Sequence, residues 1–233
     1  MDRIIRNNFR EMSDVLHSFI GDEDNVARIK AAATMMIDAL KNGHKIISCG
    51  NGGSMCDASH FSEELLARFR RNRIALPAVA ISDPSYITCV GNDYGFDQIF
   101  SRYVEACGQA GDVLLGISTS GNSEDVIRAA EVARKQGLKV VVLTGKPNGR
   151  LTGFCDVEIS APPTRFSDRA QEIHIKVIHT LVQLIEVGMG LADEDDADAA
   201  VEVDADAAVE VDAKASAGTE VRNGFRAGLA SMS

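Results

Sequence analysis

The stretch GDVLLGISTSGNSEDVI, residues 111–127, gives the strongest indication of the fold. Its first part, Asp112–Ser118, is a short apolar run, which is typical of a strand covered on both faces. A polar loop of six residues, Ser118–Ser123, follows it directly. A helix is predicted next, over Ser123–Gln136, and Gly137 ends it at the position that glycine favours. The stretch therefore predicts a strand, a tight loop and a helix in sequence.

The same alternation extends through most of the chain. Further strands are predicted at His44–Cys49, Ala78–Ser82, Lys139–Thr144 and Asp156–Ser160. Further helices are predicted at about Asp2–Phe19, Asn25–Asn42, Ser54–Arg70, Ile87–Gly91, Gln98–Cys107 and Arg169–Glu186. Strands that alternate with helices favour right-handed crossovers and a parallel sheet with helices on both faces. The predicted fold class is α/β, a three-layer sandwich with a five-stranded parallel sheet and two helices ahead of the first strand.

Two loops at predicted strand ends have the composition of a ligand site, because open parallel sheets bind ligands beyond the carboxyl ends of their strands. The first is Gly50–Ser54, and the second is Ser-Thr-Ser-Gly-Asn-Ser at 118–123. Four hydroxyls at a helix N-terminus, with free N–H groups beside them, can hold a phosphate. The alternative is that Ser123 or Asn122 merely caps the helix. Neither loop matches a Walker or dinucleotide motif, so a small phosphorylated molecule is a better candidate than ATP or a dinucleotide.

Two predicted helices each carry a polar pair on one face. His60 and Glu64 are four residues apart, and Gln171 and His179 are eight apart. A single histidine on a helix is more often structural than catalytic. If the helices converge, however, a Glu and a His in one cavity can move protons at neutral pH. The same residues can equally bind a metal ion such as zinc. Spacing alone does not establish that the helices converge.

Composition excludes several classes of protein. The chain has 233 residues and a formal net charge of −10, which argues against a nucleic-acid binder. It contains no apolar run of about 18 residues, so no membrane-spanning helix is predicted. The charged N-terminus does not resemble a secretory signal. Five widely spaced cysteines without a C-x-x-C pair suit reduced thiols in a cytoplasm.

The C-terminal segment, residues 191–233, differs from the rest of the chain. It carries eleven acidic and three basic residues, which leaves a charge of only −2 for residues 1–190. DADAAVEV occurs at 196–203 and again at 204–211. Ala, Asp, Glu and Val cannot bury enough apolar surface to offset the entropy of ordering. We expect a disordered acidic extension, with an acidic interaction tail as the alternative.

Four stretches together resemble the phosphoheptose isomerase family of sugar isomerase (SIS) domain proteins. They are SCGNGGSMCDASHFSEEL (48–65), AISDPSYITCVGNDYGFDQIFSRYVEA (80–106), GDVLLGISTSGNSEDVI (111–127) and DRAQEIHIKVIHTLVQLIE (168–186). The resemblance covers roughly residues 1–188, so it implies a SIS domain over 1–190 and excludes the tail. It implies an enzyme that interconverts sedoheptulose 7-phosphate and D-glycero-D-manno-heptose 7-phosphate through an enediol, the first step toward the heptose of lipopolysaccharide.

The resemblance also implies roles for individual residues. Glu64 and His179 would be the catalytic acid–base pair. The substrate-binding set would comprise Asn51, Gly52, Gly53, Glu64, Asn92, Asp93, Ser118, Thr119, Ser120, Ser123 and Gln171. One Zn²⁺ per subunit would be bound by His60, Glu64, Gln171 and His179. The resemblance further implies a cytoplasmic homotetramer with sites at subunit interfaces.

Two alternatives to this enzyme remain open. One is a non-catalytic SIS module that binds a sugar phosphate or a replication-initiation factor, and such a module does not need an acid–base pair. The presence of both Glu64 and His179 favours an enzyme. The other is an isomerase of a pentose or hexose phosphate, which the serine loop cannot exclude.

Overall fold

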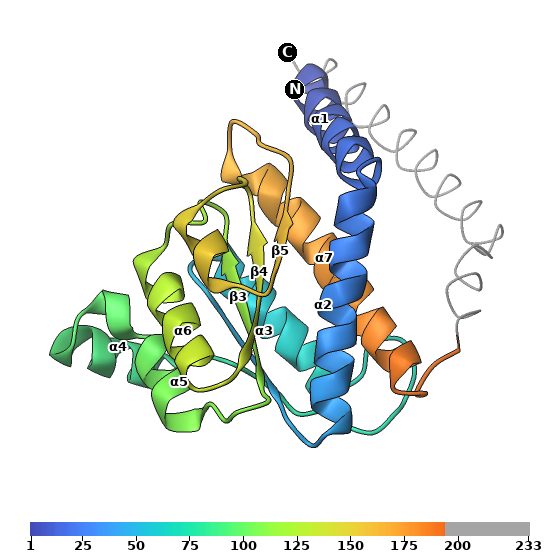
Figure 1. Cartoon of the computed structure of the whole chain (residues 1–233). Helices are drawn as coiled ribbons and strands as arrows, with labels where there is room; N and C mark the ends of the chain where they lie inside the picture. The colour runs from blue at the N-terminus through green and yellow to red at the C-terminus, as the bar shows by residue number, and fades with distance from the viewer. Residues whose placement is uncertain (194–233) are drawn as a thin grey trace, which may run out of the picture. The chain divides into compact units, whose positions relative to one another are not determined.

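Five parallel strands form a single sheet in the order β2-β1-β3-β4-β5 in the computed structural model, which describes residues 1–193 (Figure 1). The strands are β1 (Ile46–Gly50), β2 (Ala78–Ala80), β3 (Val113–Ser118), β4 (Lys139–Thr144) and β5 (Val157–Ser160). In the centre of the sheet Ile47 pairs with Leu114, and Leu114 pairs with Val140. The predicted five-stranded parallel sheet is confirmed.

Seven α-helices and two short 3-10 helices accompany the sheet within residues 1–193. They are α1 (Asp2–Ile20), α2 (Glu23–Lys41), α3 (Gly53–Leu66), α4 (Pro84–Asp93), η1 (Phe96–Gln98), α5 (Ser101–Cys107), α6 (Glu124–Lys135), η2 (Arg150–Phe154) and α7 (Ser167–Gly188). Helices α2, α3 and α7 cover one face of the sheet, and α4, α5 and α6 lie on the other side (Figure 1). The predicted three-layer α/β class is therefore confirmed.

Alternate residues of each central strand point into two separate cores. Leu115 and Ile117 of β3 pack with α2, α3 and α7, whereas Leu114 packs with α5 and α6. All six residues of β3 are buried. Because side chains alternate across a strand, a strand covered on both faces must be apolar at nearly every position. This explains why the central strands appear in the sequence as continuous apolar runs.

Helix α4 begins one turn earlier than the sequence analysis predicts. Asp83 is its N-cap, accepting a hydrogen bond from the N–H of Tyr86 at 2.8 Å, and Pro84 occupies the first helical position. An Asp-Pro pair of this kind is a recognised helix start. Helix α3, in contrast, ends at Leu66 rather than at the predicted Arg70.

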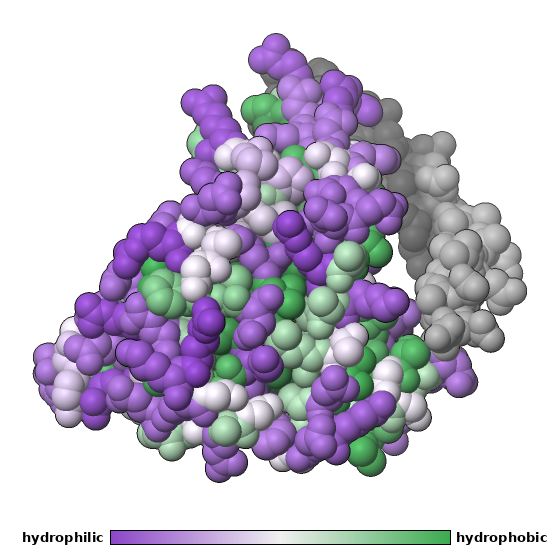
Figure 2. Space-filling view, in the orientation of Figure 1, coloured by the Kyte–Doolittle hydropathy of each residue, from purple (hydrophilic) through white to green (hydrophobic). Residues whose placement is uncertain are grey.

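Hydrophilic residues cover most of the face shown in Figure 2, with hydrophobic residues scattered among them. Within residues 1–193, none of the helices combines the length and apolar character needed to cross a bilayer. Residues 1–192 form one compact unit. The predicted acidic tail lies almost entirely outside the described residues, so the boundary at residue 190 stays a prediction.

Candidate functional site

The serine loop, residues 118–123, links the end of β3 to the start of α6. Gly121 has a φ of +66°, a conformation that favours glycine, and its N–H donates to the carbonyl of Ser118 at 3.0 Å. The hydroxyls of Ser118 and Ser123 are 2.9 Å apart. Ser123 is the N-cap residue of α6, yet its side chain makes no capping hydrogen bond. Its hydroxyl therefore does not serve the simple capping role that the sequence left open.

A cavity of about 230 Å³ opens beside this loop. Thr119 and Ser120 line one side of it, and Lys146 and Arg165 are also among its lining residues. Ser118 is buried, whereas Ser120 is exposed. The hydroxyls and the two cations together form a surface that suits an anion such as phosphate. Lys146 and Arg165 were not predicted from the sequence, since each is an isolated cation in a loop.

The loop after β1 lies close to both α6 and α7. The amide of Asn51 donates to Asp125 at 2.8 Å, which connects this loop to the first turn of α6. Gly52 has a φ of +55°. A Cβ on Gly53 would lie only 2.5 Å from Nε2 of Gln171, so glycine here allows the start of α7 to pack against the start of α3.

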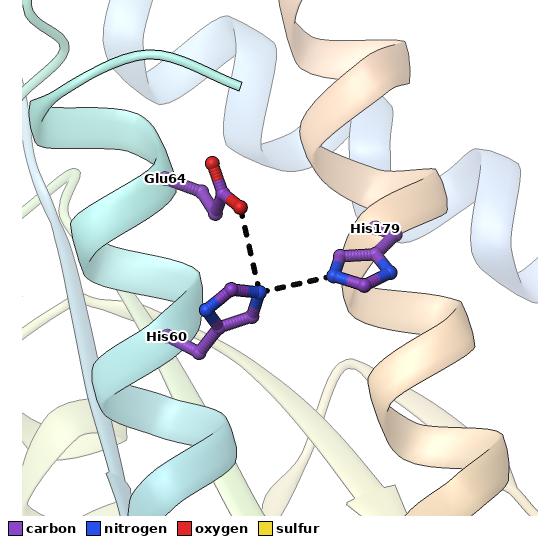
Figure 3. Close-up of side chains that lie close together, drawn as sticks. All are labelled: His60, Glu64 and His179. Carbon is purple, nitrogen blue, oxygen red and sulfur yellow. Dashed lines mark hydrogen bonds and ion pairs between the residues drawn. The ribbon is translucent and has the colours of Figure 1, made fainter. Parts of the chain in front are cut away.

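His60, Glu64 and His179 meet between α3 and α7 (Figure 3). Nε2 of His60 lies 3.0 Å from Nε2 of His179 and 3.4 Å from Oε1 of Glu64. The three side chains are partly exposed, and the ring of Phe69 lies against that of His179, with 5.6 Å between centroids. The two helices, whose convergence spacing alone did not establish, therefore do meet at these three residues.

Burial shifts the pKa values of two members of this cluster in the direction that favours the uncharged form of each side chain. Desolvation raises the pKa of Glu64, and the nearby His60 partly offsets that effect. Desolvation also lowers the pKa of His179, and the positive charges of His60, Lys176 and Arg70 act in the same direction. A carboxylate with a raised pKa is a stronger base. The two groups are thus suited to proton transfer near neutral pH.

The same three residues can hold a metal ion. One ligand atom from each lies within 4.8 Å of the other two. Two imidazoles and a carboxylate form a donor set that zinc accepts, with a further position left for another ligand. At 3.0 Å one of the two Nε2 atoms can donate a proton to the other, and a bound cation would take the lone pairs of both in place of that hydrogen bond. The residues present therefore fit a metal centre.

Other predicted site residues lie elsewhere in the chain. Gln171 is on the same helix as His179, but eight residues earlier, which corresponds to about 12 Å along the axis. Its side chain lies against Gly53. Asn92 and Asp93 are exposed at the end of α4, which belongs to the opposite layer, and their side chains contact each other at 2.9 Å. The structure thus places the predicted site residues in separate groups within one chain.

Comparison with known proteins agrees with this architecture. A SIS domain family matches residues 8–145. Phosphoheptose isomerase of Enterobacter sp. (strain 638) is 58% identical over 186 residues, covering 80% of this chain and 97% of that protein. The Vibrio cholerae phosphoheptose isomerase is 53% identical over 186 residues, with the same coverage of both chains. The structure of phosphoheptose isomerase from Neisseria gonorrhoeae matches with a TM-score of 0.74 and 38% identity, covering 80% of this chain and 98% of that one.

The chain belongs to the phosphoheptose isomerase family. This membership confirms the resemblance stated from the sequence motifs. The match spans nearly the whole of these relatives and about four-fifths of this chain. The family members named here are isomerases, so membership favours an enzyme over a non-catalytic SIS module.

Two polar residues near the cluster were missed in the sequence analysis. Asp57 lies on α3 and is nearly buried, and its Oδ2 atom has no hydrogen-bond partner among the described residues. Desolvation raises its pKa to about 6, and His60 acts in the opposite direction. Arg73 is buried beside the end of α3. Arg73 lies outside the quoted motifs, and Asp57 lies within the stretch 48–65 but was given no role there; the packing of α3 against its neighbours shows where both lie.

Proposed function

We propose that this protein is an aldose–ketose isomerase that interconverts sedoheptulose 7-phosphate and D-glycero-D-manno-heptose 7-phosphate. The observation that carries the proposal is the convergence of Glu64 and His179 from two helices. It occurs in a chain that is 58% identical to a phosphoheptose isomerase. A module that only binds a sugar phosphate has no need of such a pair.

Glu64 and His179 act as the acid–base pair. In the ketose-to-aldose direction, one group removes a proton from C1 and returns it to C2, which passes through an enediol. The other group moves a proton from the hydroxyl on C1 to the carbonyl oxygen on C2. Desolvation of both side chains supports this role. It makes the Glu64 carboxylate more basic and keeps the His179 imidazole neutral at physiological pH.

We propose one Zn²⁺ per subunit, bound by His60, Glu64 and His179, with Gln171 as the fourth ligand. When bound, zinc supplies Lewis acidity that stabilises negative charge on the substrate oxygens. The geometry of the first three side chains supports the site. Gln171 lies against Gly53, about 12 Å along α7 from His179, so in this proposal it completes the site of another subunit rather than that of its own chain.

Ser118, Thr119, Ser120 and Ser123 hold the phosphate in this proposal. Because the phosphate is remote from the reacting carbons, its binding energy serves to position the substrate. The sugar chain is lined by Asn51, Gly52, Gly53, Asn92 and Asp93.

The proposed site residues lie in different layers of one chain. The cavity at Ser120 adjoins Ala170, which is nine residues before His179 on α7. That separation, about 14 Å along the helix, supports sites shared between the subunits of a homotetramer. We place this enzyme in the cytoplasm, at the first step of heptose synthesis for lipopolysaccharide.

The test is isomerisation of sedoheptulose 7-phosphate by the full chain and by Glu64→Gln and His179→Asn variants. Each amide keeps the approximate shape of the side chain but cannot accept the proton, so turnover should fall about 10²- to 10⁴-fold. Glu131→Gln is the matched control, because Glu131 lies on α6, on the opposite face of the sheet from the cluster, and it should keep near-normal turnover. Near-normal turnover in either of the first two variants would refute the proposed acid–base pair. Binding of the sugar phosphate by the wild-type chain without an aldose product would support a non-catalytic module.

A further inference from the structure

Arg73 makes an unusual set of contacts for a residue in a connecting segment. It lies between α3 and β2, and its side chain is only 3% exposed. Its guanidinium donates to the carbonyls of Glu64 at 2.6 Å and Leu65 at 2.7 Å. It also donates to the carbonyls of Ala67 and Ile74. Most of its donors therefore point at backbone oxygens rather than at solvent.

Three of these carbonyls belong to the C-terminal end of α3. The last carbonyls of a helix have no partner within the helix, and they carry the negative end of its dipole. The guanidinium of Arg73 satisfies them with a positive charge. One of the three is the carbonyl of Glu64, the residue whose carboxylate belongs to the His60–Glu64–His179 cluster. Arg73 thus fixes the backbone of a proposed catalytic residue.

The remaining contact of the guanidinium connects α3 to α7. Nε of Arg73 donates to Oε1 of Glu186 at 2.8 Å, and the Glu186 side chain is 4% exposed. Glu186 follows His179 by seven residues, which is about two turns on the same face of α7. The ion pair therefore joins the turn of α3 that carries Glu64 to the helix that carries His179 (Figure 3 shows the two helices).

We propose that Arg73 and Glu186 are positioning residues that hold α3 and α7 at the spacing required by the His60–Glu64–His179 cluster. The proposal rests on the proposed function, in which this cluster binds a metal ion and moves protons. The ligand atoms come from two helices, so their spacing depends on how those helices pack. A displacement of about 1 Å is enough to spoil such a site. The Arg73–Glu186 pair bridges the helices close to the cluster, within one or two turns of each of its members.

A purely structural role for the pair is the alternative, and apolar replacement separates the two roles. A buried ion pair costs desolvation energy, so replacing both partners with apolar residues of similar size is often neutral for stability. An Arg73→Met/Glu186→Leu double variant leaves no unpaired buried charge, although it also removes the hydrogen bonds to the α3 carbonyls, among them that of Glu64. We expect it to fold with some loss of stability, which its melting temperature measures. A purely structural pair would leave the zinc affinity of the cluster nearly unchanged once stability is maintained, because the opposite charges of Arg73 and Glu186, which both act on Glu64, are removed together.

The experiment compares the full-length wild type with this double variant. Zinc is titrated into the metal-free proteins by calorimetry, and kcat and KM are measured with sedoheptulose 7-phosphate. We expect zinc affinity to fall about 10- to 100-fold, as is typical when a group supporting metal ligands is removed. We expect kcat to fall with it, while KM changes less than about threefold because the serine loop is untouched. Arg73→Lys, which keeps the charge but not the planar set of donors, should give an intermediate zinc affinity. If the double variant fails to fold, the Arg73→Lys variant provides the test instead.

Lys45→Met is the control for lost stability. It removes the ammonium that is bound to the buried Asp112 at 2.6 Å, next to the start of β1 and away from α7. It should lower the melting temperature without changing zinc affinity. The proposal is wrong if the folded double variant, or Arg73→Lys where the double variant does not fold, binds zinc within about twofold of wild type. It is also wrong if the wild type binds no zinc. A wild type that binds zinc but does not isomerise the sugar would refute the proposed function instead, and the zinc titrations would still decide the role of Arg73.

Discussion

Replacing His174 with Gln should remove a large part of the acid sensitivity of this fold. His174 is fully buried on α7, and its Nε2 lies 3.0 Å from the carbonyl oxygen of Thr144 on β4. That contact requires a proton on Nε2, so the neutral ring has a bare Nδ1, which has no partner among the described residues. Protonation would bury a charge and an unpaired N–H. Desolvation accordingly lowers the pKa from 6.5 to about 4, and the bond to Thr144 only partly opposes it.

A lowered pKa in the folded state makes stability depend on pH in a definite direction. Between pH 6.5 and about 4 the unfolded chain binds a proton at this position and the folded chain does not. The stability that the folded protein gains by keeping His174 neutral is therefore present above pH 6.5 and is lost as the pH falls toward 4. The shift corresponds to about 3 kcal/mol in total, of which about 2 kcal/mol falls between pH 7.5 and 5.0.

Urea denaturation of metal-free protein at fixed concentration, at pH 7.5 and 5.0, measures this effect. His174→Gln can still donate to Thr144 but does not titrate, so its loss of stability over this interval should be smaller than that of wild type by about 2 kcal/mol. His17→Gln, on the exposed surface of α1, controls for removing a histidine and should follow wild type. Equal losses in wild type and His174→Gln would show that the folded protein protonates this ring readily, and would refute the reasoning.

Three further predictions concern the proposed site. Replacing Ser120 or Ser123 with Ala removes one hydrogen bond to a charged phosphate, worth roughly 1.5–3 kcal/mol, so KM should rise about tenfold or more; unchanged KM in both variants would place the phosphate elsewhere. His60→Ala, which removes a proposed ligand but neither member of the acid–base pair, should lower zinc content and turnover together; full activity without metal would make zinc incidental. Truncation after Ala192 keeps Leu191, which packs against the core, and should leave turnover and oligomeric state unchanged; a large loss of either in a folded truncation would show that the tail contributes to the enzyme.

The layered fold could be predicted from the sequence because its strands are covered on both faces. The continuous apolar runs at β3 and β4 follow directly from that burial. Helix ends were less predictable, since they depend on local capping, as Asp83 shows for α4. The polar pairs on α3 and α7 were visible at helical spacing, but their convergence was not. It depends on two helices more than a hundred residues apart packing against the same face of the sheet.

Helix α7 shows why spacing alone could not identify the site residues. Gln171, His174 and His179 all occur within nine residues of it. Gln171 lies against Gly53, His174 donates into the core, and His179 meets His60. Rotation of α7 by a single residue, about 100° around its axis, would exchange these environments and bury a different group. The packing of α7 on β4 and α3 therefore decides which histidine is structural and which can take part in chemistry. A contact that fixes α7 against α3, such as the pair formed by Arg73 and Glu186, consequently bears on the chemistry of the site as well as on the stability of the fold.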